Sequence, residues 1–119
     1  GLAFVNLVDF DMVFGHRRDT RGYARAVMEF DAWLGDFLAA MKEADVLMIT
    51  ADHGCDPRAP GTDHTREYVP LLAYGAMVRA GCDLGTRPAF ADVGATIAEI
   101  FGVEFVTRGR SFWREIANS

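Results

Sequence analysis

The sequence predicts an α/β fold with a mostly parallel sheet and helices on both faces. Two segments, residues 2–8 (LAFVNLV) and 45–50 (DVLMIT), are almost continuously apolar. Such runs are typical of strands that are buried on both faces of a parallel sheet. Residues 22–42 and 90–101 instead repeat their apolar side chains at the spacing of amphipathic helices. The alternation of the two patterns is what indicates the α/β class.

The two long helices follow from the spacing of their apolar residues. In the segment 22–42 the apolar positions are three or four residues apart, and they are Val27, Phe30, Leu34, Phe37 and Met41. The helix expected over residues 90–101 stops before Gly102, a residue type that often ends helices. The tail 109–118 (GRSFWREIAN) predicts one more short helix.

A third strand is expected over residues 69–74 (VPLLAY), near the edge of the sheet, because Pro70 cannot donate a hydrogen bond to a neighbouring strand. Polar loops follow the first and second apolar runs. In open α/β sheets ligands bind outside the carboxyl ends of the strands. We therefore expect these two loops to open on the same edge and to bring the three histidines of the chain together.

Composition limits the possible functions. The chain has 119 residues, of which 50% are hydrophobic, so it is large enough for one folded domain and is not a disordered chain. A net charge of −5 gives no support to nucleic-acid binding, and no apolar run is long enough to span a membrane. Cys55 and Cys82 lack CxxC spacing, which favours two reduced thiols in a cytoplasmic protein over the alternative, a disulfide.

The two polar loops concentrate carboxylate and imidazole groups. The first loop offers Asp11 and His16, and the second offers Asp52, His53 and His64. Carboxylate and imidazole ligands without thiolate suit manganese, zinc or iron. Any one Asp–His pair is also common in a solvated turn, so the prediction of a metal site depends on the two loops meeting.

Arginines accompany both loops. They are Arg17, Arg18, Arg58 and Arg66. These side chains are either ordinary surface charges or groups that bind a phosphate ester, which a guanidinium grips with two hydrogen bonds. Beside a metal site the second interpretation predicts a phosphorylated substrate.

Residues 6–31 (NLVDFDMVFGHRRDTRGYARAVMEFD) and 49–72 (ITADHGCDPRAPGTDHTREYVPLL) closely resemble the phosphopentomutases, members of the alkaline phosphatase superfamily. The resemblance implies a three-layer alkaline-phosphatase-like core. Residues 1–119 would be the C-terminal segment of that metal-binding core domain, with the cap domain and the N-terminal core segment absent. The family interconverts ribose 1-phosphate and ribose 5-phosphate, and the deoxyribose counterparts, through a phosphothreonine at a two-metal site. Its usual metal is manganese.

Carried over by motif, the resemblance implies two sets of metal ligands. Asp11, His16 and His64 would hold one ion, while Asp52 and His53 would bind the second. Pentose phosphate is then the expected partner, without nucleic acid or membrane. No residue of the chain is assigned to the substrate.

The resemblance implies no catalytic nucleophile within the chain. None of its loop threonines has the sequence context of the family's nucleophile; they are Thr20, Thr50, Thr62 and Thr65. Asp9 and Asp63 match the motifs, and we expect them to orient ligands by hydrogen bonds rather than to bind metal. The isolated chain is therefore expected to be inactive as a mutase.

Two other functions stay open. One is a different enzyme of the superfamily, such as the cofactor-independent phosphoglycerate mutase or a phosphatase. The other is a non-catalytic metal-binding module, which the missing nucleophile favours. A further expectation concerns association. Because the chain begins inside an apolar run that predicts a core strand, the isolated chain is expected to expose that surface and to self-associate.

Overall fold

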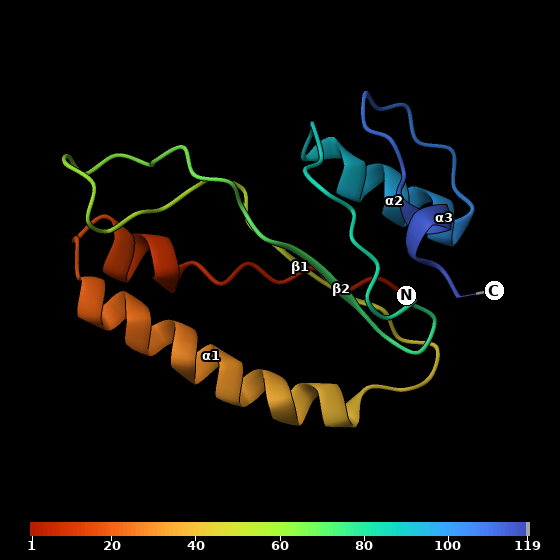
Figure 1. The fold of residues 1–119 in the computed structure, drawn as a ribbon, viewed down its shortest axis with the longest axis horizontal. Helices are drawn as coiled ribbons and strands as arrows, with labels where there is room; N and C mark the ends of the chain where they lie inside the picture. The colour runs from red at the N-terminus through yellow and green to blue at the C-terminus, as the bar shows by residue number, and fades with distance from the viewer. Residues whose placement is uncertain (119) are drawn as a thin grey trace. The chain divides into compact units, whose positions relative to one another are not determined.

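The computed structural model describes residues 1–118, and Figure 1 shows the order of their elements. These are the π-helical turn η1 (Phe10–Gly15), helix α1 (Thr20–Ala40), strands β1 (Leu47–Thr50) and β2 (Leu71–Tyr74), and helices α2 (Ala91–Phe101) and α3 (Trp113–Ile116). The chain forms two compact units. The first comprises Gly1–Met41 and Thr50–Leu71, and the second comprises Lys42–Ile49 and the chain from Leu72 onward. No helix among the described residues is long and apolar enough to cross a membrane.

Helix α1 confirms the helix predicted over residues 22–42, with both ends two residues earlier. Its start is fixed by Asp19, whose carboxylate accepts a hydrogen bond from the Gly22 N–H at 2.9 Å. Such a cap satisfies a backbone donor that has no partner inside the helix. Gly22 is buried in this first turn, and a β-carbon there would collide with Asp19 and with the ring of Phe14. The polar cap and the glycine together explain why the helix begins before its apolar stripe.

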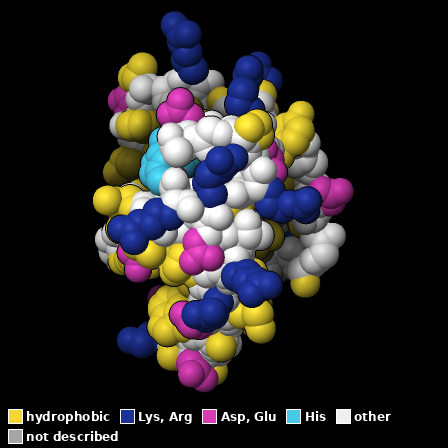
Figure 2. Space-filling model, turned by 90° about the vertical axis from the view of Figure 1, so that its left-hand side faces the viewer, with side chains coloured by type: hydrophobic (Ala, Val, Ile, Leu, Met, Phe, Trp, Pro, Cys, Tyr) yellow, Lys and Arg dark blue, Asp and Glu magenta, His cyan; other side chains and the backbone are white. Residues whose placement is uncertain are grey.

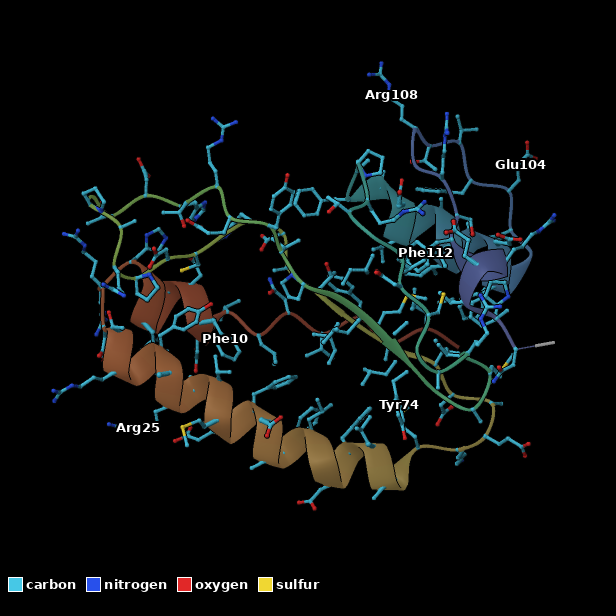
Figure 3. All side chains as sticks on the ribbon, viewed as in Figure 1. Phe10, Arg25, Tyr74, Glu104, Arg108 and Phe112 are labelled. Carbon is cyan, nitrogen blue, oxygen red and sulfur yellow. The ribbon has the colours of Figure 1, made fainter. Side chains whose placement is uncertain are left out.

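The first polar loop was predicted to be irregular, but it contains η1. The His16 N–H donates to the Asp11 carbonyl at 2.9 Å, and the Asp19 N–H donates to the Phe14 carbonyl at 2.9 Å. These five-residue steps are those of a π-helix, which often occurs at functional sites. The ring of Phe10 packs edge-on against Tyr23 of α1, with ring centroids 5.8 Å apart, and anchors the turn to the helix (Figure 3).

Strands β1 and β2 confirm the strands expected at 45–50 and 69–74, and they form one two-stranded sheet. The two strands are antiparallel, so the expected parallel pairing is not found among the described residues. The connection between them explains the difference. Residues 51–70 turn back on themselves, and Gly54 and Thr65 form an antiparallel bridge. A returning loop joins antiparallel strands, whereas a parallel pair needs a crossover connection.

The strand expected over residues 2–8 is not a strand in the structure. A strand needs a neighbour to satisfy its N–H and C=O groups, and no described segment pairs with this one. Its apolar side chains consequently face solvent, with Phe4 86% exposed. The apolar sequence therefore marks a segment that is able to form a strand, but no segment within residues 1–118 pairs with it.

The second unit contains the most completely buried side chains. Phe112, which directly precedes α3, is fully buried (Figure 3), and Ile116 of α3 and Ala98 of α2 are buried as well. The Thr96 hydroxyl donates to the Asp92 carbonyl at 2.7 Å and accepts from the Phe112 N–H at 3.0 Å. Gly102 ends α2 with a left-handed φ of 62°, as the sequence predicts. The short helix expected in the tail is α3.

We expect the isolated chain to self-associate. Apolar side chains are exposed on residues 2–8 and on α1, where Met28 and Trp33 are 72% and 53% exposed. Exposed apolar surface favours association with a partner in water. Light scattering at several concentrations, with a hydrophobic dye in parallel samples, measures the effect. The double variant Phe4→Lys/Met28→Lys should bind less dye, and a wild-type monomer without dye binding would contradict the prediction.

Candidate metal centre

Two loops of the first unit supply the candidate site. Asp11 and His16 come from η1 and its end, and His53 and His64 come from the loop between β1 and β2. The second loop is closed at its base by the Thr65 N–H, which donates to the Gly54 carbonyl at 3.2 Å. A β-carbon at Gly54 would collide with the Glu67 nitrogen and the Thr65 carbonyl, so only glycine allows this approach. Because the base is closed, His53 and His64 lie on the two opposite sides of the loop.

The three histidines converge on one carboxylate oxygen. The Nε2 atoms of His16, His64 and His53 lie 3.3, 3.5 and 4.0 Å from Oδ2 of Asp11. The ligand atoms of Asp11, His16 and His64 all lie within 4.8 Å of one another. The His53 ring stacks on the His64 ring, with centroids 3.6 Å apart. This confirms the expectation that the histidines meet, and Figure 2 shows them at the surface of this face.

Hydrogen bonds determine which ring nitrogen of His16 and of His53 has a free lone pair. Nδ1 of His16 lies 2.5 Å from the Thr62 carbonyl, and Nδ1 of His53 lies 2.9 Å from the Gly54 carbonyl. A carbonyl oxygen can only accept, so Nδ1 must carry the hydrogen in both rings. In a neutral imidazole Nε2 then presents its lone pair, here toward Asp11. Histidines that bind metals are usually held in this tautomer by the same kind of partner.

The arrangement fits a divalent cation. Lone pairs of neutral imidazoles facing a carboxylate oxygen repel unless a positive charge lies between them. The separations of 3.3 and 3.5 Å from Oδ2 of Asp11 to Nε2 of His16 and His64 would allow these three atoms to bind one ion. The donor set, one carboxylate with imidazoles, suits manganese, zinc or iron.

The other predicted site residues are placed less centrally. Asp52 is 88% exposed at its side chain, and its Oδ1 lies 3.7 Å from Nε2 of His53. This pair adjoins the cluster through His53 without closing a second site by itself. Asp9 and Asp63 make no side-chain hydrogen bond or ion pair within residues 1–118, so the structure gives no support to their expected orienting role.

Cys55, two residues after His53 in the second loop, is a neighbour of the cluster. Gly15 lies so close to it that a β-carbon at Gly15 would be 2.5 Å from the Cys55 sulfur. Burial raises the pKa of the Cys55 thiol, and the nearby carboxylates, that of Asp11 first, raise it further. The thiol is therefore neutral at physiological pH, as a structural rather than a reactive cysteine would be. Both cysteines are free, in agreement with the prediction of reduced thiols.

Comparison with known proteins agrees with this geometry. A family model described as the metalloenzyme superfamily matches residues 1–105. The chain belongs to the metalloenzyme superfamily. Membership of this superfamily implies that a divalent metal is bound, and the cluster around Asp11 offers suitable ligands.

Individual relatives of this superfamily are highly similar to the chain. It is 59% identical over 116 residues to the phosphopentomutases of Clostridium novyi and Caldanaerobacter subterraneus, a match that includes 98% of the chain. It is 60% identical over 112 residues, 94% of the chain, to the phosphopentomutase of Syntrophotalea carbinolica. These values confirm the resemblance found in the sequence motifs. The chain spans about 30% of the length of these relatives.

Proposed function

We propose that the chain is the C-terminal segment of the metal-binding core domain of a phosphopentomutase. The observation that carries the proposal is the identity of 57–60% to phosphopentomutases over 94–98% of the chain. The whole protein would interconvert ribose 1-phosphate and ribose 5-phosphate, and the deoxyribose counterparts, through a phosphothreonine. Its core would be the three-layer, mostly parallel sheet of the alkaline phosphatase superfamily. It would act in the cytoplasm, where its two thiols stay reduced.

In this proposal the cluster holds one divalent ion and contributes to a second. Asp11, His16 and His64 would hold the first ion, supported by ligand atoms within 4.8 Å of one another. Asp52 and His53 would contribute to the second, whose other ligands lie outside the chain. Manganese is the proposed metal for both, because carboxylate and imidazole donors suit it.

The chain's own residues would position the ions and attract the substrate. Two bound ions would stabilise the negative charge that develops on the oxygens of a transferring phosphoryl group. The Thr62 and Gly54 carbonyls fix the rings of His16 and His53, so these ligands are oriented in advance. Figure 2 shows the histidines at the surface, and the arginines of the two loops would add positive charge that attracts an anionic sugar phosphate; they are Arg17, Arg18, Arg58 and Arg66. The nucleophilic threonine would come from outside the chain.

The test is a direct assay of the complete natural protein. With manganese it should convert ribose 1-phosphate to ribose 5-phosphate, and His64→Ala should remove that activity. The 119-residue chain alone should show none, because it lacks the nucleophile. Interconversion of phosphoglycerates instead would identify another enzyme of the superfamily. Metal binding without turnover on any phosphate ester would favour the non-catalytic module.

Metal affinity should fall as the pH is lowered from 8 to 5. Protons compete with the ion for the imidazole nitrogens that bind it. With two histidine ligands, the affinity should drop by up to about a hundredfold per pH unit once both imidazoles are protonated in the metal-free chain. Titration calorimetry with manganese at pH 8, 7, 6 and 5 measures the dependence. An affinity that does not change over this range would show that the histidines are not ligands.

A further inference from the structure

Arg18 has an unusual backbone conformation beside the metal centre. Its φ is 57°, and it is the only residue other than glycine with positive φ within residues 1–118. Side chains with a β-carbon disfavour this left-handed region, which glycine and asparagine enter more easily. The Arg18 N–H donates to the Gly15 carbonyl at 2.9 Å, so the strained residue closes the turn between η1 and α1. Strain of this kind collects at functional sites.

The Arg18 side chain crosses to the second loop. Its Nη2 donates to the Ala59 carbonyl at 2.6 Å. His16 makes the other such link, from Nδ1 to the Thr62 carbonyl. Both links run from side chains of the first loop to backbone carbonyls of residues 59–62 in the second, on either side of Gly61.

Residues 59–62 have little other support. The antiparallel bridge of the second loop lies at its base, between Gly54 and Thr65. Beyond that bridge, the segment has one backbone-to-backbone hydrogen bond among the described residues. The Ala59 N–H donates to the Asp56 carbonyl at 3.0 Å and closes a turn. His64 sits between the bridge and residues 59–62. Its position opposite Asp11 is therefore set by the bridge and the stacked His53 ring together with the links from His16 and Arg18, which hold the far end of the loop.

We propose that Arg18 is a positioning residue for the metal centre. By holding the Ala59 carbonyl it keeps the second loop against the first, so that His64 stays within ligand distance of Asp11. It acts through the loop backbone, without contacting a ligand atom, and its positive φ is the energetic cost of that geometry. The inference rests on the proposed metal-binding role of Asp11, His16 and His64.

The charge of Arg18 and its hydrogen bond to the Ala59 carbonyl should have opposite effects on metal affinity, which makes the inference testable. A guanidinium close to a cation repels it, so removing the charge of Arg18 should tighten metal binding if charge alone mattered. Removing the link to Ala59 should weaken binding if Arg18 positions the loop. The direction of the change therefore separates the two effects. Arg17 is a matched control, because it has the same charge at the adjacent position and makes no side-chain hydrogen bond within residues 1–118.

The experiment measures manganese affinity by titration calorimetry and thermal unfolding by circular dichroism, on the full 119-residue chain. Arg18→Gly and Arg18→Asn should unfold at the same temperature or higher, because both relieve the positive φ. Both should bind manganese about three- to tenfold more weakly, at or below the lower end of the range for partners that orient metal ligands. Arg18→Lys keeps a charged donor and should stay within about twofold of wild type. Arg17→Ala should bind as tightly as wild type or more tightly.

The outcomes test the role of Arg18 separately from the metal centre on which it depends. Unchanged or tighter binding in Arg18→Gly and Arg18→Asn, beside a wild type that binds, would overturn the role of Arg18 alone. A lower unfolding temperature in both variants would overturn the assignment of backbone strain. A wild-type chain that binds no manganese would overturn the metal centre and the role of Arg18 together.

Discussion

Replacing Asp11 by alanine is expected to abolish high-affinity binding of a divalent metal. The Oδ2 atom of Asp11 is the single atom that faces Nε2 of all three histidines, at 3.3 to 4.0 Å. Without it the imidazoles remain, and within residues 1–118 the carboxylate that still pairs with one of them is the exposed Asp52, 3.7 Å from His53. Loss of partners that only orient a ligand lowers metal affinity by about 10- to 100-fold. Loss of this central ligand should exceed about a hundredfold.

Matched variants show whether the effect belongs to the site. Asp9→Ala removes a carboxylate two residues away that has no contact with the cluster, and it should leave manganese affinity unchanged. His64→Ala removes one of three ligands and should lie between Asp9→Ala and Asp11→Ala. Titration calorimetry gives the affinities, and circular dichroism checks that α1 is intact. Equal affinity in Asp11→Ala and wild type would refute the ligand assignment.

The helices were predictable because their signals are local. The apolar spacing in residues 22–42 and the helix end at Gly102 act within a few residues, whereas the capping carboxylate of Asp19, which sets the start of α1, was not predicted. The strands were harder. An apolar run such as residues 2–8 indicates the ability to form a strand, but pairing depends on a partner strand that the run itself does not identify. The direction of β2 relative to β1 likewise depends on the path of the connecting loop, which residue types alone do not encode.

The candidate site was predictable in its residue types and in the meeting of its histidines. Three features were not. Exposure of Asp52, the left-handed backbone of Arg18 and the approach of Cys55 to Gly15 follow from the path of two irregular loops. The link from His16 to the Thr62 carbonyl spans 46 residues and ends on a backbone atom, which has no side-chain identity to recognise. Sequence patterns of fixed spacing therefore find the candidate ligands but not the groups that orient them.

The second large effect is expected at Asp92, and it concerns the stability of the C-terminal unit. Asp92 is only 1% exposed, and its two oxygens accept from the Arg87 Nε at 2.9 Å and the Arg110 N–H at 2.8 Å. The hydrogen bond to Asp92 is the main cause that raises the pKa of Arg87, with that to Glu115 adding to it, so Arg87 stays charged. The same guanidinium lies over the Phe112 ring, 5.5 Å from its centroid. Asp92 thereby joins the start of α2 to the segment that enters α3.

Asp92→Ala should lower the free energy of unfolding of this unit by about 3 kcal/mol, because it leaves a largely buried guanidinium with Glu115 as its remaining acidic partner. Asp92→Asn keeps an acceptor for the Arg110 N–H and should lose less. Glu99→Ala is the control: it breaks an ion pair with Arg114, whose side chain is 91% exposed, and solvent screening makes such pairs weak. Urea unfolding followed by Trp113 fluorescence, in a Trp33→Phe background, reports on the C-terminal unit alone. Equal destabilisation by Asp92→Ala and Glu99→Ala would show that the buried carboxylate does not hold the two helices together.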